Sequence, residues 1–125
     1  MNRVLWVLQV VFGLYFVGVG VIHFVLPEGL PEMISWMYDL DDGLHLAAGT
    51  AEILGGLGLI LPAVTRIRPE LVSWAAYGLV IVMIGAAVWH ISRGEAAQIV
   101  LNVINAAILG FIGYGRQRLH PLESR

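Results

Sequence analysis

Three side chains of this sequence combine acid–base chemistry with an apolar setting: Glu52, His23 and His90. Glu52 lies deep within the apolar run Leu44–Leu61, where it is the one charged residue. A charged side chain at the centre of a membrane span costs about 2.5–3.5 kcal/mol on insertion scales, so such a group usually has polar partners and often a task. Histidine titrates near neutral pH and could exchange protons with a carboxylate. We therefore take these three residues as the candidate catalytic groups, which would carry protons or contact a ligand.

A second set of polar residues shares helical faces. Gln98, Asn102 and Asn105 are spaced i, i+4 and i+7, which places them on one face of a helix. His45 precedes Glu52 by seven residues and therefore lies on the same face as that residue. Lipid cannot satisfy such groups, so both faces are expected to turn inward. The pattern predicts a polar pocket in one half of a helix bundle, with His45, Asn102 and Asn105 as candidate ligand-binding residues.

Each of these residues also has a purely structural interpretation. Asn102 and Asn105 could join neighbouring helices by hydrogen bonds without binding a ligand. His45, which lies beside an acidic turn, could form a hydrogen bond at the membrane interface. Glu52 could be a neutral carboxyl bonded across the bundle, because burial disfavours the charged form. The sequence leaves these alternatives open.

A metal site is not expected. His23, His90 and Glu52 are ligand types that zinc, iron or manganese accept. However, no two of them have i, i+4 spacing on one helix, and no histidine-rich or cysteine motif is present. Haem held by two axial histidines is equally unsupported.

The composition identifies the elements that must position these groups. Of the 125 residues, 58% are hydrophobic and 13% are charged, against about 45–50% and 25% in soluble domains. The net charge of −2 gives no general attraction to nucleic acid, so no nucleic-acid partner is expected. Cysteine is absent, which excludes disulfides and a thiol relay carried by this chain. The expected environment is the lipid bilayer.

Four apolar segments are long enough to cross a bilayer, which takes about 20 residues. They are Val4–Leu26, Leu44–Leu61, Leu71–Ile91 and Ala96–Tyr114. The prolines fall outside these segments, and the glycines of the second segment favour close helix packing. The sequence therefore predicts an all-α bundle of four transmembrane helices, which forms a single integral membrane domain over residues 1–125.

The arginines predict the orientation of the bundle. All but Arg93 flank the segment ends that share one side with both termini. The first loop carries acidic residues and no basic residue. By the positive-inside rule, both termini are expected in the cytoplasm. Every strongly polar side chain of the spans is then expected in the outer half, with an almost entirely aliphatic inner half, so the predicted pocket opens outward.

The first outer loop has a helical pattern of its own. Apolar residues recur at helical spacing between Leu30 and Leu40, with acidic residues on the other side. Pro31 suits a first helical turn. We expect a short amphipathic helix on the outer surface. The alternative is a loop that packs against the bundle.

Several of these stretches resemble the sequence signatures of the DoxX-like membrane proteins. Gly49–Pro62, which contains the pattern Glu-x-x-Gly-Gly-x-Gly-Leu, resembles the second span of that family. His23-Phe24 at the end of the first span fits the same pattern, as do Ile84–His90 in the third span and the closing Gly113–Arg116. The resemblance covers nearly the whole chain.

The resemblance implies a compact four-helix protein, usually of a bacterial inner membrane. The family's namesake is similar to the small membrane subunit of a thiosulfate:quinone oxidoreductase, and other members are similar to accessory proteins of redox or maturation systems. Glu52, His23 and His90 match polar positions of the family. Relatives that work in disulfide chemistry need cysteines, which this chain lacks. A shared fold does not transfer a reaction.

The sequence leaves three functions open. In the first, the pocket holds a quinone head group or a small reductant, and Glu52 and a histidine handle protons. In the second, the protein is a non-catalytic subunit or assembly factor that contacts other membrane proteins or forms a homo-oligomer. In the third, oligomers carry a small molecule, although an aliphatic inner half argues against a continuous pore. We prefer a redox-linked or accessory role and leave open whether the chain itself is an enzyme.

Overall fold

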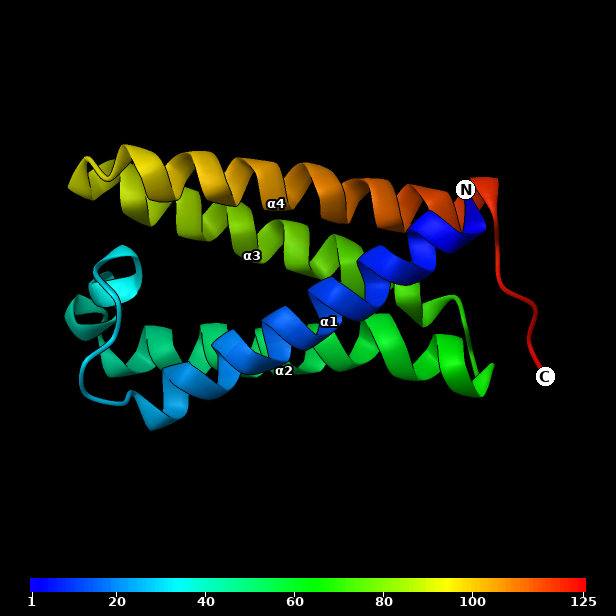
Figure 1. The fold of residues 1–125 in the computed structure, drawn as a ribbon, viewed down its shortest axis with the longest axis horizontal. Coiled ribbons are helices and arrows are strands. Elements are labelled where there is room, and N and C mark those ends of the chain that lie inside the picture. Colours follow the sequence, from blue (N-terminus) through cyan, green and yellow to red (C-terminus); the bar gives the residue numbers. More distant parts are fainter.

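The computed structural model describes residues 1–125 and contains helices and no strands. Its elements are α1 (Asn2–Val25), the 3₁₀ helix η1 (Glu32–Asp39), α2 (Asp42–Thr65), α3 (Leu71–Arg93), α4 (Ala96–Tyr114) and the π-helical turn η2 (Gly115–Leu119). The four long helices form two antiparallel hairpins, α1–α2 and α3–α4 (Figure 1). Both chain termini lie at one end of the bundle, here the termini end. The segment η1 and the α3–α4 connection lie at the other, here the η1 end (Figure 1).

All four long helices are long and apolar enough to cross a membrane. This confirms the predicted all-α bundle of four membrane-spanning helices. The cytoplasmic location of the termini stays a prediction.

The helix bounds differ from the predicted spans mainly at the polar ends. Helix α2 begins two residues earlier than predicted and extends four residues further, to Thr65. Pro62, which directly follows the predicted second span, lies inside α2 because the helix extends beyond that span. The helix continues past this residue, with the Arg66 N–H donating to the Pro62 carbonyl at 3.0 Å. Within a membrane bundle, neighbouring groups readily compensate for the N–H that a proline lacks.

Helices α1 and α2 cross at very short range because glycines face each other at two levels. A Cβ on Gly56 would lie 2.6 Å from the Gly13 carbonyl oxygen, and a Cβ on Gly20 would lie 2.8 Å from the Gly49 carbonyl oxygen. Each helix carries its two glycines seven residues apart, so they share one face. Small residues at such positions let membrane helices approach closely. This packing brings the side chains next to the glycines into direct contact.

The apolar core fills the middle of the bundle and extends toward the termini end. Its members come from all four long helices: Phe16, Leu59, Ala63, Val72, Ala76, Leu79, Met83, Leu109 and Ile112. Residues of the α2 and α3 segments nearer to η1 do not belong to this core. The η1 half of the bundle is therefore where polar groups and open space can occur.

The loop between α1 and α2 folds against the η1 end. Tyr38 holds the two ends of the loop together, because its hydroxyl donates to the Pro27 carbonyl at 2.6 Å and accepts from the Leu30 N–H at 3.0 Å. Met37 is fully buried. The loop contains a 3₁₀ helix where a short amphipathic helix is predicted, and Pro31 is its N-cap. Its predicted place on the outer surface stays a prediction.

Candidate functional site

His23 and Glu52 meet where α1 crosses α2. The His23 Nε2 atom lies 3.3 Å from Glu52 Oε2, and both side chains are buried. The Gly20–Gly49 contact described above lies within one turn of each residue and holds the two backbones close enough for this distance. The contact is within ion-pair range, yet Glu52 Oε2 receives no well-aligned hydrogen bond and is fully buried. This oxygen therefore has hydrogen-bonding capacity that the protein leaves unused.

His45 extends this contact toward η1. Its Nδ1 atom lies 2.8 Å from His23 Nδ1, and its Nε2 atom lies 2.8 Å from the Met37 carbonyl oxygen. The start of α2 is fixed by Asp41, whose carboxylate accepts the Leu44 N–H at 2.8 Å and thus serves as the N-cap. His45 is in the first turn of that helix and is buried. His45, His23 and Glu52 therefore form one continuous chain of buried polar contacts, here called the His–Glu chain.

A cleft of 670 Å³ opens beside the His–Glu chain, between α2, α3 and η1. Its walls are mostly apolar and include Trp36, Trp89 and alanines of α2. The ionisable side chains that line it are His23, Glu52 and His90. Trp36 reaches the cleft from η1 and packs edge-on against His90, with the ring centroids 4.7 Å apart. The cleft is thus an aromatic and aliphatic space with titratable groups on its wall.

A second, shallower groove of 430 Å³ adjoins the cleft along the α2–α3 interface. The two spaces share Ala51 and Val82 in their linings. The groove continues toward the termini end past Gly55, Gly58 and Gly78. Its lining is largely apolar, which suits a hydrocarbon chain.

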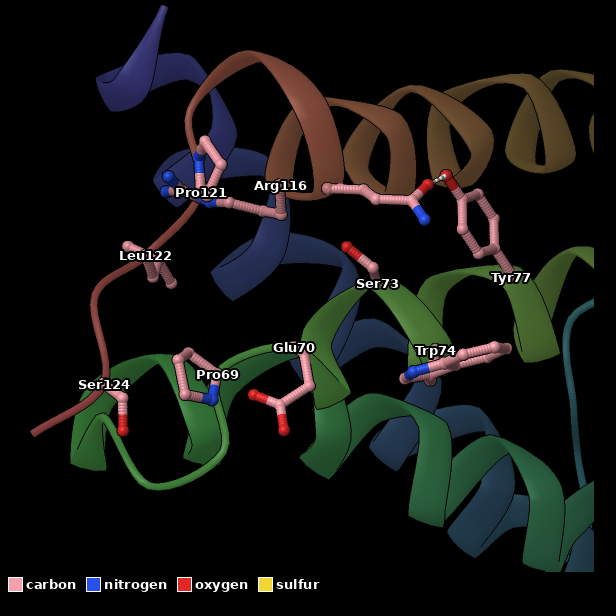
Figure 2. Close-up of a pocket in the computed structure, with 10 residues that line it drawn as sticks. Pro69, Glu70, Ser73, Trp74, Tyr77, Arg116, Pro121, Leu122 and Ser124 are labelled. Carbon is pink, nitrogen blue, oxygen red and sulfur yellow. Dashed lines mark hydrogen bonds between the residues drawn. The ribbon is translucent and has the colours of Figure 1, made fainter.

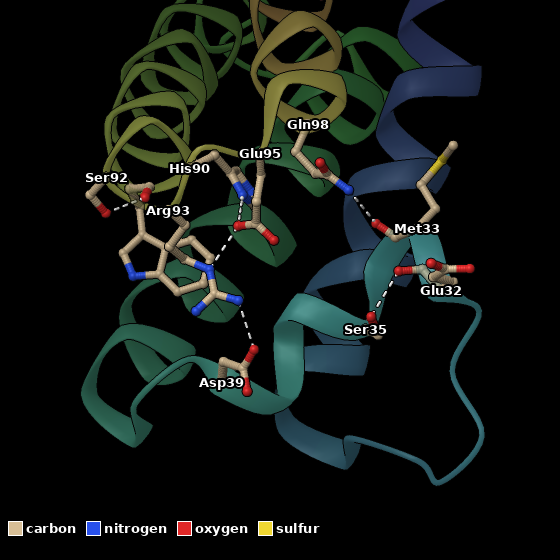
Figure 3. Close-up of polar contacts among 10 residues, drawn as sticks. Glu32, Met33, Ser35, Asp39, His90, Ser92, Arg93, Glu95 and Gln98 are labelled. Carbon is tan, nitrogen blue, oxygen red and sulfur yellow. Dashed lines mark hydrogen bonds and ion pairs between the residues drawn. The ribbon is translucent and has the colours of Figure 1, made fainter.

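His90 is oriented by an ion-pair network at the η1 end (Figure 3). Its Nδ1 atom lies 3.0 Å from Glu95 Oε1, which also accepts Arg93 Nε at 2.7 Å. Arg93 in turn donates to Asp39 of η1 at 2.7 Å. Hydrogen bonds from Arg93 and then from His90 lower the pKa of Glu95. The carboxylate only accepts, so His90 donates from Nδ1 in this contact.

Two further contacts complete the η1 end. The Gln98 amide donates to the Met33 carbonyl at 3.0 Å, which joins α4 to η1 (Figure 3). The Arg93 guanidinium lies 4.7 Å from the centre of the Trp89 ring, a cation–π distance. The Gln98–Met33 hydrogen bond and the Arg93–Asp39 ion pair together hold η1 over the cleft.

The structure brings together some of the sequence-predicted site residues and separates others. The candidate catalytic residues His23, Glu52 and His90 line one cleft. Of the candidate ligand-binding residues, His45 contacts His23 but is not part of the cleft lining, and neither are Asn102 and Asn105. Both asparagines are half-buried, and the Asn102 amide nitrogen is buried without a hydrogen-bond partner. Their ligand-binding role stays a prediction.

The expectation of an aliphatic half without strongly polar side chains is wrong. Near the termini end, Gln9 is fully buried and its amide donates to the Leu59 carbonyl at 2.8 Å. Its oxygen accepts Arg116 Nε at 2.6 Å, and Arg116 is buried as well. Gln9 precedes Phe16 and His23 by one and two heptads, so it shares their inward face. That spacing is the sequence signal that could have identified it.

A smaller pocket of 270 Å³ lies near this pair (Figure 2). Its walls include Ser73, whose hydroxyl donates to the Gly113 carbonyl at 2.9 Å, and Tyr77, whose hydroxyl donates to Gln117 at 2.8 Å. The Arg116 side chain extends from this pocket toward α1 (Figure 2). The Ser73 and Tyr77 hydroxyls are thus occupied by contacts within the protein, whereas the Nη2 atom of Arg116 is buried without a hydrogen-bond partner.

The arrangement at the η1 end can exchange protons and form hydrogen bonds with a ligand in the cleft. His23 and Glu52 come from different helices and share a polar contact, and His90 adds a further titratable group from the α3 side. No group of three or more His, Asp or Glu side chains is arranged to hold a metal ion. The site's own chemistry is therefore that of acid–base groups beside an apolar cleft.

Comparison with known proteins identifies a family. A model of the DoxX-like family matches residues 7–112. No curated protein and no solved structure is significantly similar to the chain.

Proposed function

This protein belongs to the DoxX-like family of membrane proteins, and from that premise we propose that it binds a quinone head group, or a similarly small redox-active ligand, in the cleft at the η1 end. In this role it is a membrane component of a redox-linked system, located in a bacterial inner membrane with both termini in the cytoplasm. Electrons are supplied and removed by partner proteins of that system. This chain binds the ligand and handles its protons.

The cleft suits the chemistry of a quinone. A quinone is a flat ring with two carbonyl oxygens and an apolar tail. The ring fits between apolar and aromatic walls that include Trp36 and Trp89, and the tail fits the adjoining α2–α3 groove. The oxygens need hydrogen-bond donors when oxidised and acceptors when reduced, and histidine and carboxyl groups provide both. The cleft volume of 670 Å³ lies within the range of about 300–1,000 Å³ that is usual for small-molecule sites.

The observation that carries this proposal is the convergence of His23, Glu52 and His90, from three different helices, on the wall of one apolar cleft. A purely structural polar contact would need no adjoining space. The buried Glu52 oxygen without a hydrogen bond supports the same interpretation. Unpaired buried polar atoms are costly and rare in native proteins.

The direct test is quinone binding by the purified protein in lipid nanodiscs. A short-chain ubiquinone or menaquinone analogue is titrated, and quenching of tryptophan fluorescence reports occupancy beside Trp36 and Trp89. We expect saturable binding. We also expect Gly85→Leu to weaken it at least tenfold, because Gly85 lines the cleft and a Cβ there meets no atom within 4 Å. The new side chain would occupy the ligand's space without disturbing the fold.

Gly18→Leu is the matched control. Gly18 also lies on an exposed helix face with no atom within 4 Å of an added Cβ, but it is outside the cleft. Its binding curve should equal that of the unmodified protein. Glu52→Gln should raise the dissociation constant about tenfold, because it removes one hydrogen bond between the ligand and a charged or proton-sharing group. Absence of saturable binding, or equal binding by all variants, would refute the proposal.

A non-catalytic subunit is the second candidate function, and the small-residue groove favours it. Gly55, Gly58 and Gly78 line the exposed α2–α3 groove, and a Cβ on Gly78 meets no atom within 4 Å. Grooves of small residues accept neighbouring helices in membranes. Chemical cross-linking in native membranes from Gly78→Cys would then capture one defined partner or a second copy. A protein that remains uncrosslinked and monomeric there would exclude this role.

A further inference from the structure

The His–Glu chain consists of three contacts that each need a proton. His45 Nε2 lies 2.8 Å from the Met37 carbonyl oxygen, His45 Nδ1 lies 2.8 Å from His23 Nδ1, and His23 Nε2 lies 3.3 Å from Glu52 Oε2. A carbonyl oxygen only accepts, so the first contact requires a proton on His45 Nε2. Two ring nitrogens at 2.8 Å repel each other unless one proton lies between them. The His23–Glu52 contact is longer and is not a well-aligned hydrogen bond, but two acceptors at this distance also repel each other unless a proton lies between them.

We infer that His45 is a positioning residue for the proton shared by His23 and Glu52. Its contacts require the His–Glu chain to hold three protons. One of these protons therefore stays at the His23–Glu52 contact, on the wall of the cleft, where it can be transferred. The inference deepens the proposed function, since it identifies the proton that a bound ligand would receive. Three arrangements satisfy all three contacts. In the first, His23 is an imidazolium beside an ionised Glu52. In the second, Glu52 is protonated and His23 is neutral. In the third, His45 is the imidazolium, and a neutral His23 donates to an ionised Glu52.

Every one of these arrangements has zero net charge. Loss of one proton from the chain would leave two acceptors facing each other and a net charge of −1 in the low-dielectric interior. Uncompensated charge is costly within a membrane protein, and an unpaired buried acceptor adds a further penalty. Without His45, in contrast, a neutral His23 could place its single proton on Nε2, donate it to an ionised Glu52 and leave Nδ1 free. The His45 ring, fixed by the Met37 carbonyl, prevents this solution.

The neighbouring groups do not replace this proton. Tyr15 of α1 lies near Glu52 and near Asn105 of α4, but no hydrogen bond joins it to the buried Glu52 oxygen. His90 of α3 lines the same cleft, but its Nδ1 proton is engaged by Glu95. Asp41 caps α2 one turn before His45, and its carboxylate is occupied by a backbone N–H. The His23–Glu52 contact is therefore the proton-sharing contact of which both members line the cleft.

The test counts protons in the complete protein in nanodiscs, without any quinone. Nitrogen-15 NMR of labelled histidine rings distinguishes protonated from unprotonated ring nitrogens, and the infrared carboxyl band reports the protonation of Glu52. Glu52→Gln assigns that band. At pH 7 we expect three protons in total on the two rings and the carboxyl group. Two neutral rings together with an ionised Glu52 would overturn the inference.

Variants at position 45 test the positioning role separately. His45→Gln can donate its amide N–H to Met37 and accept the His23 Nδ1 proton, so it should retain the requirement for the extra proton. His45→Leu removes the requirement. The His23–Glu52 pair should then hold its second proton about tenfold less strongly, which matches the loss of one hydrogen bond. His120→Gln, in the exposed C-terminal tail, is the control and should leave the count unchanged.

The outcomes separate the two proposals. Equal proton loss in His45→Leu and His45→Gln would overturn the positioning role. The proton count in the unmodified protein decides the inference even if His45→Leu fails to fold. A count of three protons without any quinone binding would refute the proposed ligand, but the inference about the His–Glu chain would stand.

Discussion

The His–Glu chain near the η1 end and the Gln9–Arg116 pair near the termini end are both buried, and each contains one polar atom without a hydrogen bond, yet they are built from different kinds of groups. All three members of the His–Glu chain can gain or lose a proton, and two of them line an open cleft. The other group is built around an arginine, which stays protonated in proteins. Its partners are neutral oxygens of Gln9, Asn2 and His120. Burial alone therefore does not mark the functional site, whereas titratable groups beside open space do.

The Gln9–Arg116 pair instead joins the first and last helices. Arg116 lies in η2, directly after α4, and it binds Gln9 and Asn2 of α1 at 2.6 and 2.7 Å. Its guanidinium also lies 5.5 Å from the centre of the Trp6 ring. Helices α1 and α4 make few other contacts along their length. We therefore interpret this pair as the structural connection that closes the bundle at the termini end.

Among the variants that test this comparison, Gln9→Leu should have the largest effect on stability. Gln9→Leu leaves the buried guanidinium without its closest acceptor, and we expect it to lower the free energy of unfolding by about 3 kcal/mol, the range for breaking a buried charged contact. Denaturant unfolding in micelles, followed by tryptophan fluorescence, measures this change. The double variant Gln9→Leu/Arg116→Met removes both partners and should recover at least half of the loss. A double variant that is less stable than Gln9→Leu would contradict the structural role of the pair.

The α1–α2 crossing should be the next most sensitive feature, because it positions His23 against Glu52. Gly56→Ala places a methyl group 2.6 Å from the Gly13 carbonyl oxygen, which is backbone and cannot rotate away. We expect the helices to separate, with a loss of about 2 kcal/mol in the free energy of unfolding. Gly85→Ala is the matched control at an exposed position of α3 and should change stability little, since its Cβ meets no atom within 4 Å. Equal stability of the two variants would show that the crossing is not tightly packed.

The sequence predicts the helices and much of the candidate site for physical reasons that can be stated. Apolar length alone identifies four spans, since a bilayer sets the length of a helix that crosses it. The inward direction of Glu52 follows from the cost of a charge facing lipid. Its meeting with His23 depends on the glycines at 20 and 49, whose shared face is visible in the sequence but whose partner helix is not.

Other parts of the site could not be predicted from the sequence. The contact of His45 with His23 depends on the path of the loop, which brings the Met37 carbonyl over the start of α2. The role of Trp36 in the cleft wall has the same origin. Arg116 follows the last span, where arginine usually extends into the headgroup region. A π-helical turn directs it inward instead, and no spacing rule predicts that turn.

Glu52→Gln tests the same comparison at the η1 end, where a substitution of a buried polar group should change stability little. The glutamine amide keeps the shape of the carboxyl group and can donate to His23 Nε2, so no buried atom loses its partner. We expect the free energy of unfolding to change by less than about 1 kcal/mol, in contrast to Gln9→Leu at the other end. The same denaturant titration measures both variants. A loss as large as that of Gln9→Leu would mean that Glu52 acts mainly as a structural group.

The ion-pair network at the η1 end should give the smallest effect, with a distinctive dependence on pH. Folding lowers the pKa of Glu95 below its ordinary value of 4.5, chiefly through the hydrogen bond from Arg93 and then through that from His90. A lowered pKa in the folded state stabilises the protein above about pH 4.5, and this stabilisation is lost as the pH falls through the lower folded-state value. Because the network is partly exposed to solvent, its contribution is small.

Glu95→Gln should therefore lower the melting temperature slightly at pH 7, and the difference from the unmodified protein should shrink to nothing below the folded-state pKa. Glu28→Gln, at an exposed loop position, is the control and should show no such convergence. A difference that persists unchanged at pH 3 would assign the effect to lost packing. In that case the packing of Trp36 and Met37 would hold η1 over the cleft. Charged side chains would then contribute to stability only at the termini end, through Arg116.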